Sequence, residues 1–124
     1  MNLFKQLYSA LKSAPSGVRH VAPAEAARLV ATGKAVLIDV RESEEWVDGV
    51  AAPAHLLALS DLAGARRTWT TFLARHRDDE LILYCRSGGR SCSAADVLAN
   101  EGFRVANLGG FSAWRAAGLP IRQP

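Results

Sequence analysis

The residues best suited to chemistry lie in one short stretch, Tyr84 to Ser91, which reads Tyr-Cys-Arg-Ser-Gly-Gly-Arg-Ser. It follows the apolar run 81–84 and precedes a helical pattern at 94–99. The pattern therefore predicts that Cys85 ends a strand and that a polar loop leads into a helix. The first amides of a helix lack intrahelical partners, and the helix dipole is positive there. These features predict a thiolate nucleophile at Cys85.

The loop itself has the composition of an anion cradle. Gly88 and Gly89 let the backbone curl with its N–H groups turned inward, and Arg86 and Arg90 add positive charge. We expect this environment to lower the pKa of the Cys85 thiol. The alternative is a buried cysteine at a strand end beside an ordinary glycine turn. Two glycines, two arginines and a helix start make that alternative the weaker interpretation.

The other metal-ligating and thiol side chains form no further site. Cys92 falls on the helix after the loop, where a buried small residue is a better interpretation than a resolving thiol. Two cysteines are too few for a secreted disulfide framework, and we therefore expect a reducing cytoplasm. His20, His55 and His76 lack paired-ligand spacing, so we expect no metal site.

Composition restricts the classes of partner. The chain has 124 residues, 49% of them hydrophobic and 22% charged, which suits one compact domain. Its formal net charge of +3 is spread along the sequence without a basic run or basic–aromatic interleaving. We therefore expect small anionic substrates and no nucleic acid. No apolar stretch is long enough for an integral membrane segment.

Two parts of the chain are expected to differ in kind. Residues 1–14 carry apolar side chains on one helical face, which predicts a short amphipathic helix that packs on the domain or on a partner. Lys5 and Gln6 interrupt its apolar character, so it does not resemble a signal peptide. Pro15 to Gly17 break the pattern, and residues 18–122 form the predicted domain.

Strands and helices alternate along this domain. We expect strands at 18–21, 35–40, 54–57, 81–84 and 104–108, and helices at 23–31, 43–47, 60–75, 91–101 and 111–117. Ser43 and Ser60 are the predicted N-caps of the second and third helices. The alternation predicts an α/β fold with a mostly parallel sheet, in which ligands bind beyond the carboxyl ends of the strands. The loop after Cys85 lies at such an end, and so does the segment Asp39-Val40-Arg41.

Three blocks of the sequence resemble the rhodanese family of single-domain sulfurtransferases. The first is Ile38-Asp39-Val40-Arg41 with Glu45-Trp46 and Gly49 after it, and the second is the loop of Cys85. The third runs from Leu108-Gly109-Gly110 through Ala113-Trp114 to Gly118-Leu119-Pro120. The blocks span nearly the whole domain in the family's order. One departure stands out, because Val50 occupies the position where the family usually has a histidine after the glycine.

The resemblance implies a five-stranded, mostly parallel sheet flanked by helices on both faces. It implies transfer of sulfane sulfur from thiosulfate or a persulfide to a thiol or cyanide, through a persulfide on Cys85 and without a cofactor. The residues agree with this chemistry, since inward amides of the loop would hold the persulfide charge. We expect substrate contacts from the loop residues Arg86, Ser87, Gly88, Gly89, Arg90 and Ser91. Arg90 alternatively pairs with an acid, and Asp39, Arg41 and Glu45 are expected to brace the loops.

Two other functions are compatible with the same residues. Cysteine-dependent phosphatases and arsenate reductases also combine a thiolate, an amide cradle and an arginine, but on longer loops. Here four residues, Arg86 to Gly89, separate Cys85 from Arg90, and this tighter ring suits a single sulfur atom better. A rhodanese-like sulfur carrier or interaction module, acting on a sulfur-accepting protein, is the second alternative.

Overall fold

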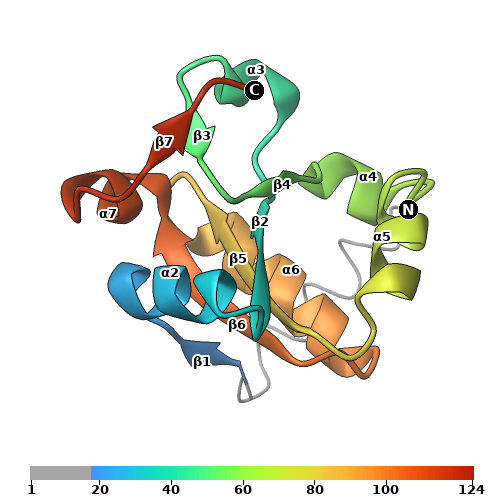
Figure 1. The fold of residues 1–124 in the computed structure, drawn as a ribbon. Coiled ribbons are helices and arrows are strands. Elements are labelled where there is room, and N and C mark those ends of the chain that lie inside the picture. The colour runs from blue at the N-terminus through green and yellow to red at the C-terminus, as the bar shows by residue number, and fades with distance from the viewer. Residues whose placement is uncertain (1–17) are drawn as a thin grey trace.

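The computed structural model describes residues 18–124 of the chain (Figure 1). The predicted amphipathic segment 1–14 lies outside the described residues. No helix within residues 18–124 combines the length and the apolar character needed to cross a membrane.

The main sheet has five parallel strands in the order β1-β6-β5-β2-β4. Their bounds are Arg19–His20 (β1), Ala35–Asp39 (β2), His55–Leu56 (β4), Glu80–Cys85 (β5) and Val105–Gly110 (β6). The predicted α/β class and five-stranded parallel sheet are therefore confirmed. Strand β5, which carries Cys85 at its carboxyl end, occupies the centre of the sheet, so the cysteine is supported by strands on both sides.

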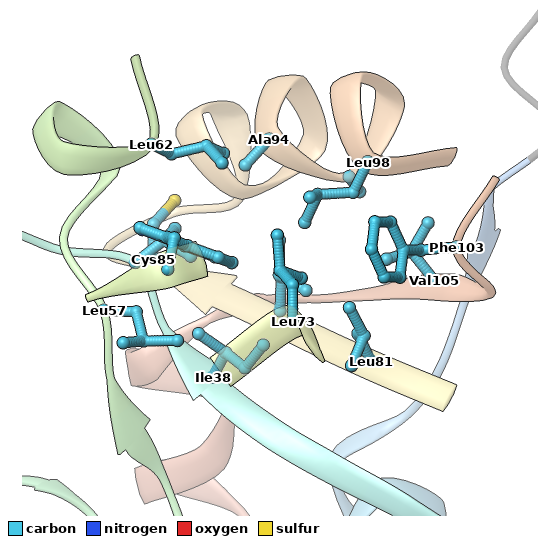
Figure 2. Packing of buried hydrophobic residues seen from close by; sticks show 14 residues of the cluster. Ile38, Leu57, Leu62, Leu73, Leu81, Cys85, Ala94, Leu98, Phe103 and Val105 are labelled. Atoms are coloured by element: carbon cyan, nitrogen blue, oxygen red, sulfur yellow. The ribbon is translucent and has the colours of Figure 1, made fainter. Parts of the chain in front are cut away.

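Helices cover both faces of this sheet, as expected (Figure 1). The helices are α2 (Pro23–Ala31), α3 (Ser43–Trp46), α4 (Leu59–Ala63), α5 (Trp69–Arg75), α6 (Gly89–Asn100) and α7 (Phe111–Ala116). Alternate side chains of β5 enter two separate cores. Leu81, Leu83 and Cys85 pack with residues of α4, α5 and α6, whereas Ile82 and Tyr84 pack with residues of α2 and α7. Figure 2 shows Cys85 in the first core, near Leu57 and Leu62.

The helix predicted over 60–75 is wrong, because the segment forms α4 and α5 with a break between them. The carboxylate of Asp61 accepts hydrogen bonds from the amides of Arg67 and Thr68, at 2.8 and 2.9 Å, which satisfies the backbone where α5 begins. Ser60 is not the N-cap either, since α4 begins after Ala58. The Ser60 hydroxyl instead donates to Glu42 Oε1 at 2.6 Å.

The N-cap predicted for α3 is also corrected. Glu42 rather than Ser43 is the cap, and it forms a reciprocal capping box with Glu45. The amide of Glu42 donates to Glu45 Oε2 at 2.8 Å. A capping box normally begins with serine or threonine. Because the cap here is a glutamate, the sequence pattern did not indicate where α3 begins.

A second, two-stranded sheet was not predicted. Strands β3 (Val50–Ala51) and β7 (Ile121–Arg122) pair antiparallel, which joins the C-terminal residues to the segment after α3. Val50, the departure from the rhodanese pattern, is fully buried in β3. Both strands directly follow a turn residue, Gly49 before β3 and Pro120 before β7, so the sequence marks these positions as turns rather than strands.

Candidate active site

The carboxyl ends of two neighbouring strands bring the predicted site residues to one edge of the sheet. Asp39 at the end of β2 lies opposite Tyr84 in β5, so the segment 39–41 is adjacent to the loop after Cys85. On the other side of β5, an irregularity in the pairing places Gly110 of β6 opposite Cys85. This is the edge at which parallel α/β sheets bind ligands.

The loop after Cys85 points hydrogen-bond donors at the sulfur. The amides of Gly88 and Ser91 lie 3.0 and 3.4 Å from Cys85 Sγ, and the Ser91 hydroxyl oxygen lies 3.5 Å away. Gly88 caps α6 with φ of 106°, a left-handed conformation that favours glycine. Gly89, by contrast, is the first residue of α6. The sulfur thus lies at the N-terminus of a twelve-residue helix.

These donors determine the acidity of the thiol. Burial acts against the charged form, and the side chain is only 1% exposed. The Ser91 hydroxyl and the amides of Ser91, Gly88 and Ser87 act in the opposite direction and prevail, so the pKa of Cys85 is lowered. The loop therefore stabilises the charged form of the Cys85 thiol through one hydroxyl and several backbone amides.

Asn107 is a polar residue of this site that the sequence reasoning missed. Its Oδ1 accepts hydrogen bonds from Ser91 Oγ at 2.8 Å and from the Gly109 amide at 3.0 Å. Its Nδ2 donates to the Gly88 carbonyl at 3.3 Å. Asn107 therefore holds both residues whose amides reach the sulfur. The available signal was a single amide side chain within the otherwise apolar run 105–108.

Gly110 is a second missed residue, and its role is steric. A Cβ atom at this position would lie 2.6 Å from the Arg86 carbonyl oxygen and 3.2 Å from Ser87 Cα. Such contacts are closer than real Cβ atoms make with backbone, so only glycine lets β6 approach the loop this closely. In the sequence, Gly109-Gly110 belongs to the third rhodanese-like block, which does not by itself indicate this contact.

The guanidinium of Arg90 is already paired with a carboxylate. Its guanidinium forms a bidentate ion pair with the Glu45 carboxylate, with N–O distances of 2.7 and 2.8 Å. The Arg90 hydrogen bond, only partly offset by burial, lowers the pKa of Glu45 to about 2. The pair connects the first turn of α6 to α3. Of the two roles expected for Arg90, substrate contact and pairing with an acid, the structure has the pairing.

Asp39 and Arg41 form a buried ion pair beneath the site. Arg41 Nη2 lies 2.8 Å from Asp39 Oδ2 and donates to the Gly49 carbonyl at 2.8 Å. Arg41 Nη1 donates to the backbone carbonyl of Glu45 at 3.4 Å. The guanidinium also stacks on the Phe111 ring at 4.4 Å. These contacts tie the end of β2 to α3 and α7.

A pocket of about 530 Å³, which we call the α7 pocket, borders the loop at Arg86. Its lining residues are Arg41, Glu45, Asp48, Arg86, Phe111, Ser112, Arg115 and Ala116. Arg86 and Ser87 are exposed next to the buried Cys85. Residues 18–124 contain no group of three or more His, Cys, Asp or Glu side chains arranged to hold a metal ion.

The expected burial of Cys92 is wrong, because its side chain is exposed. It follows Ser91 directly on α6, and the turn of the helix directs it away from the packed face. Burial of part of the side chain, with the negative charges of Asp96 and Cys85, raises its pKa. The two thiols therefore differ in both respects: Cys85 is buried and has a lowered pKa, whereas Cys92 is exposed and has a raised pKa.

Comparisons with known proteins agree with the geometry. The family model described as "Rhodanese-like domain" matches residues 22–117. A "Sulfurtransferase" of Allochromatium vinosum is 34% identical over 106 residues, which cover 78% of this chain and 87% of that protein. The "Thiosulfate sulfurtransferase GlpE" of Actinobacillus succinogenes is 31% identical over 103 residues, covering 82% and 87%. The crystal structure of a rhodanese-related protein from Thermoplasma volcanium has a TM-score of 0.72 at 25% identity, covering 86% and 99%.

The family match covers most of the chain, and the relatives named as sulfurtransferases match over most of their own length. These similarities support sulfurtransferase activity in general. They also confirm the family suggested by the three sequence blocks. This chain belongs to the family of rhodanese-like domains.

Proposed function

We propose that this protein transfers sulfane sulfur from thiosulfate or a persulfide to a thiol or cyanide, through a persulfide on Cys85. One observation carries the proposal: Cys85 Sγ lies within hydrogen-bonding distance of the Gly88 and Ser91 amides at the N-terminus of α6. A fixed ring of donors of this kind stabilises negative charge on sulfur without reorganisation. The thiosulfate sulfurtransferase among the relatives has the same reaction in its name.

The reaction proceeds in two balanced halves. The Cys85 thiolate attacks the outer sulfur of thiosulfate, a new S–S bond forms, and sulfite leaves with the electron pair of the broken bond. The outer sulfur then carries the negative charge on Cys85. An acceptor thiolate or cyanide attacks that sulfur, and Cys85 leaves as the thiolate that the loop already stabilises. Splitting the transfer in this way is covalent catalysis, and it requires no cofactor.

The loop residues take different roles in this proposal. The amides of Ser87, Gly88 and Ser91 hold the sulfur charge, while Gly89 starts the helix that aligns them. Arg86 binds the sulfonate end of the donor, since its side chain is exposed on the α7 pocket. Arg90 orients the loop through Glu45 rather than binding substrate, and the pair of Asp39 and Arg41 braces the same edge.

Two features disfavour phosphatase or arsenate reductase chemistry. The ring between Cys85 and Arg90 has four residues, and the Arg90 guanidinium is occupied by Glu45. A tetrahedral oxyanion needs donors on several oxygens, which this arrangement does not offer. A carrier that passes sulfur to a protein partner would use the same Cys85 chemistry. A reducing cytoplasm is the compartment in which both free thiols would persist.

Intact-mass measurement after incubation with thiosulfate tests the proposal. Native protein and the Cys92→Ser variant should both gain the mass of one sulfur atom, and added cyanide should remove it. Cys85→Ser should fold, take up no sulfur and lack thiosulfate-to-cyanide activity. If the native protein instead hydrolyses p-nitrophenyl phosphate and takes no sulfur from thiosulfate or persulfides, the phosphatase alternative is correct.

A further inference from the structure

The α7 pocket contains two arginines whose charges are not neutralised. Neither Arg86 nor Arg115 forms an ion pair with any carboxylate of residues 18–124. The other arginine of the lining, Arg41, is paired with Asp39, and the Glu45 carboxylate is paired with Arg90. Asp48 adds one carboxylate to the lining. The charged groups of the pocket that have no ion-pair partner among residues 18–124 are therefore the guanidiniums of Arg86 and Arg115 and the carboxylate of Asp48.

Arg115 is held at the pocket although it is exposed. Its Nη2 donates to the Asp48 backbone carbonyl at 3.3 Å. Its guanidinium lies 5.3 Å from the centre of the Phe111 ring, which Arg41 also contacts at 4.4 Å. These contacts restrain the side chain of α7 without neutralising its charge. A restrained and unpaired arginine suits a carboxylate, which it can bind through two parallel hydrogen bonds.

The size of the pocket indicates a ligand larger than the simplest sulfur substrates. A volume of about 530 Å³ is within the range that holds small organic ligands. Thiosulfate and cyanide would fill only a small part of it. One arginine next to Cys85 would suffice for a sulfonate, so the second arginine, on α7, can bind an anionic group farther from the reacting sulfur.

We propose that Arg115 is a specificity-determining residue that, with Arg86, selects organic sulfur carriers bearing carboxylates. The preferred acceptor is then a carboxylated thiol rather than a neutral thiol or cyanide. This inference rests on the proposed function. The acceptor thiolate attacks the outer sulfur of the Cys85 persulfide, the S–S bond to Cys85 breaks, and the Cys85 thiolate is released. The proton of the persulfide, where present, stays with the transferred sulfur.

Two acceptors of similar size test this selectivity. Mercaptosuccinate carries two carboxylates, whereas 1-thioglycerol carries two hydroxyls at comparable positions. The measured quantity is kcat/KM for each acceptor, at saturating thiosulfate, in the native protein and in variants. For each protein, kcat/KM for mercaptosuccinate is divided by kcat/KM for 1-thioglycerol. Comparing this ratio between proteins cancels the intrinsic reactivities of the two thiols. Arg75→Gln is the matched control, because Arg75 is exposed at the end of α5 and outside the pocket.

Arg115→Gln keeps a donor for the Asp48 carbonyl but removes the charge. We expect this variant to lower the ratio of kcat/KM for mercaptosuccinate to kcat/KM for 1-thioglycerol about fivefold. This is the size of effect expected from losing one partly exposed, charged hydrogen bond. Arg115→Glu should lower the ratio further, and Arg75→Gln should leave it as in the native protein. Equal loss for both acceptors, or the same change in Arg75→Gln, would overturn the inference. Failure of Cys85 to take up any sulfur would refute the proposed function instead.

Discussion

Asn107 Oδ1 lies 2.8 Å from the Ser91 hydroxyl oxygen, whereas Cys85 Sγ lies 3.5 Å from the same oxygen. A hydroxyl has one proton, so Asn107 Oδ1 and Cys85 Sγ compete for it. The hydroxyl is therefore shared between Asn107 and the sulfur. The amides of Ser91, Gly88 and Ser87 also lower the pKa of Cys85, so the sulfur keeps several donors when the hydroxyl is removed.

This relationship predicts the order of two substitutions. Ser91→Ala should raise the pKa of Cys85 only slightly, because it leaves the amides of the loop in place. Asn107→Asp should raise it more, since it adds a negative charge and turns the donor that faces the Gly88 carbonyl into an acceptor. The pH dependence of iodoacetamide labelling at Cys85 measures both shifts. A larger shift in Ser91→Ala would show that the hydroxyl is the main donor to the sulfur.

The two thiols should separate in their pH dependence. The lowered pKa of Cys85 means that its thiolate persists below the ordinary cysteine value of about 8.5, and that labelling and sulfur transfer decline as the pH falls through the lowered value. The raised pKa of Cys92 moves its labelling to higher pH despite its exposure. Peptide mapping after brief labelling at a series of pH values distinguishes the two. Preferential labelling of Cys92 near neutral pH would contradict the expectation.

The two loop arginines should differ in kinetic effect. Arg86→Gln should raise KM for thiosulfate roughly threefold to tenfold with a smaller change in kcat, because it removes binding shared by the ground and transition states. Arg90→Gln should have the smaller effect on KM, since Glu45 already occupies its guanidinium. Steady-state kinetics with varied thiosulfate and fixed cyanide test this contrast. The assignment is reversed if Arg90→Gln alone raises KM.

The ion pair of Arg90 and Glu45 also predicts a pH dependence of stability. The folded protein has a Glu45 pKa of about 2, below its ordinary value of 4.5. A lowered pKa contributes stability above the ordinary value, and that contribution is lost as the pH falls from about 4.5 toward 2. Urea unfolding of native protein and Arg90→Gln should therefore differ most above pH 4.5 and converge in more acidic buffer. A difference that does not change with pH would exclude the ion pair as its source.

Two glycines near the loop should respond differently to an added methyl group. Gly110→Ala places Cβ against the Arg86 carbonyl oxygen and should displace the loop, lowering sulfurtransferase activity at least tenfold. Gly89→Ala is the control because, apart from its chain neighbours and the backbone of its own helix, no atom would lie within 4 Å of its Cβ. Activity and circular dichroism of both variants separate loop displacement from unfolding. Equal activity in the two variants would show that β6 can move away from the loop.

The sequence alone determined the alternation of strands and helices, the parallel sheet and the position of Cys85 before a helix. These features are local, because they depend on apolar runs, on glycine and proline breaks and on side-chain type. It did not determine the short strands β3 and β7, the division of 60–75 into α4 and α5, or the Glu42 cap. Those depend on contacts such as the Asp61 carboxylate with the amides of Arg67 and Thr68.

Within the site, the sequence identified the residues of the loop but left the direction of Arg90 open. Only the tertiary structure decided it, because Glu45 approaches Arg90 from α3, far away in the chain. The same holds for Asn107 and Gly110, which reach the loop because β6 pairs with β5. Arg115 meets Arg86 at the α7 pocket for a similar reason, since α7 follows β6 at this edge of the sheet. Side-chain type specifies what a residue can do, but the packing of distant elements decides which partner it meets.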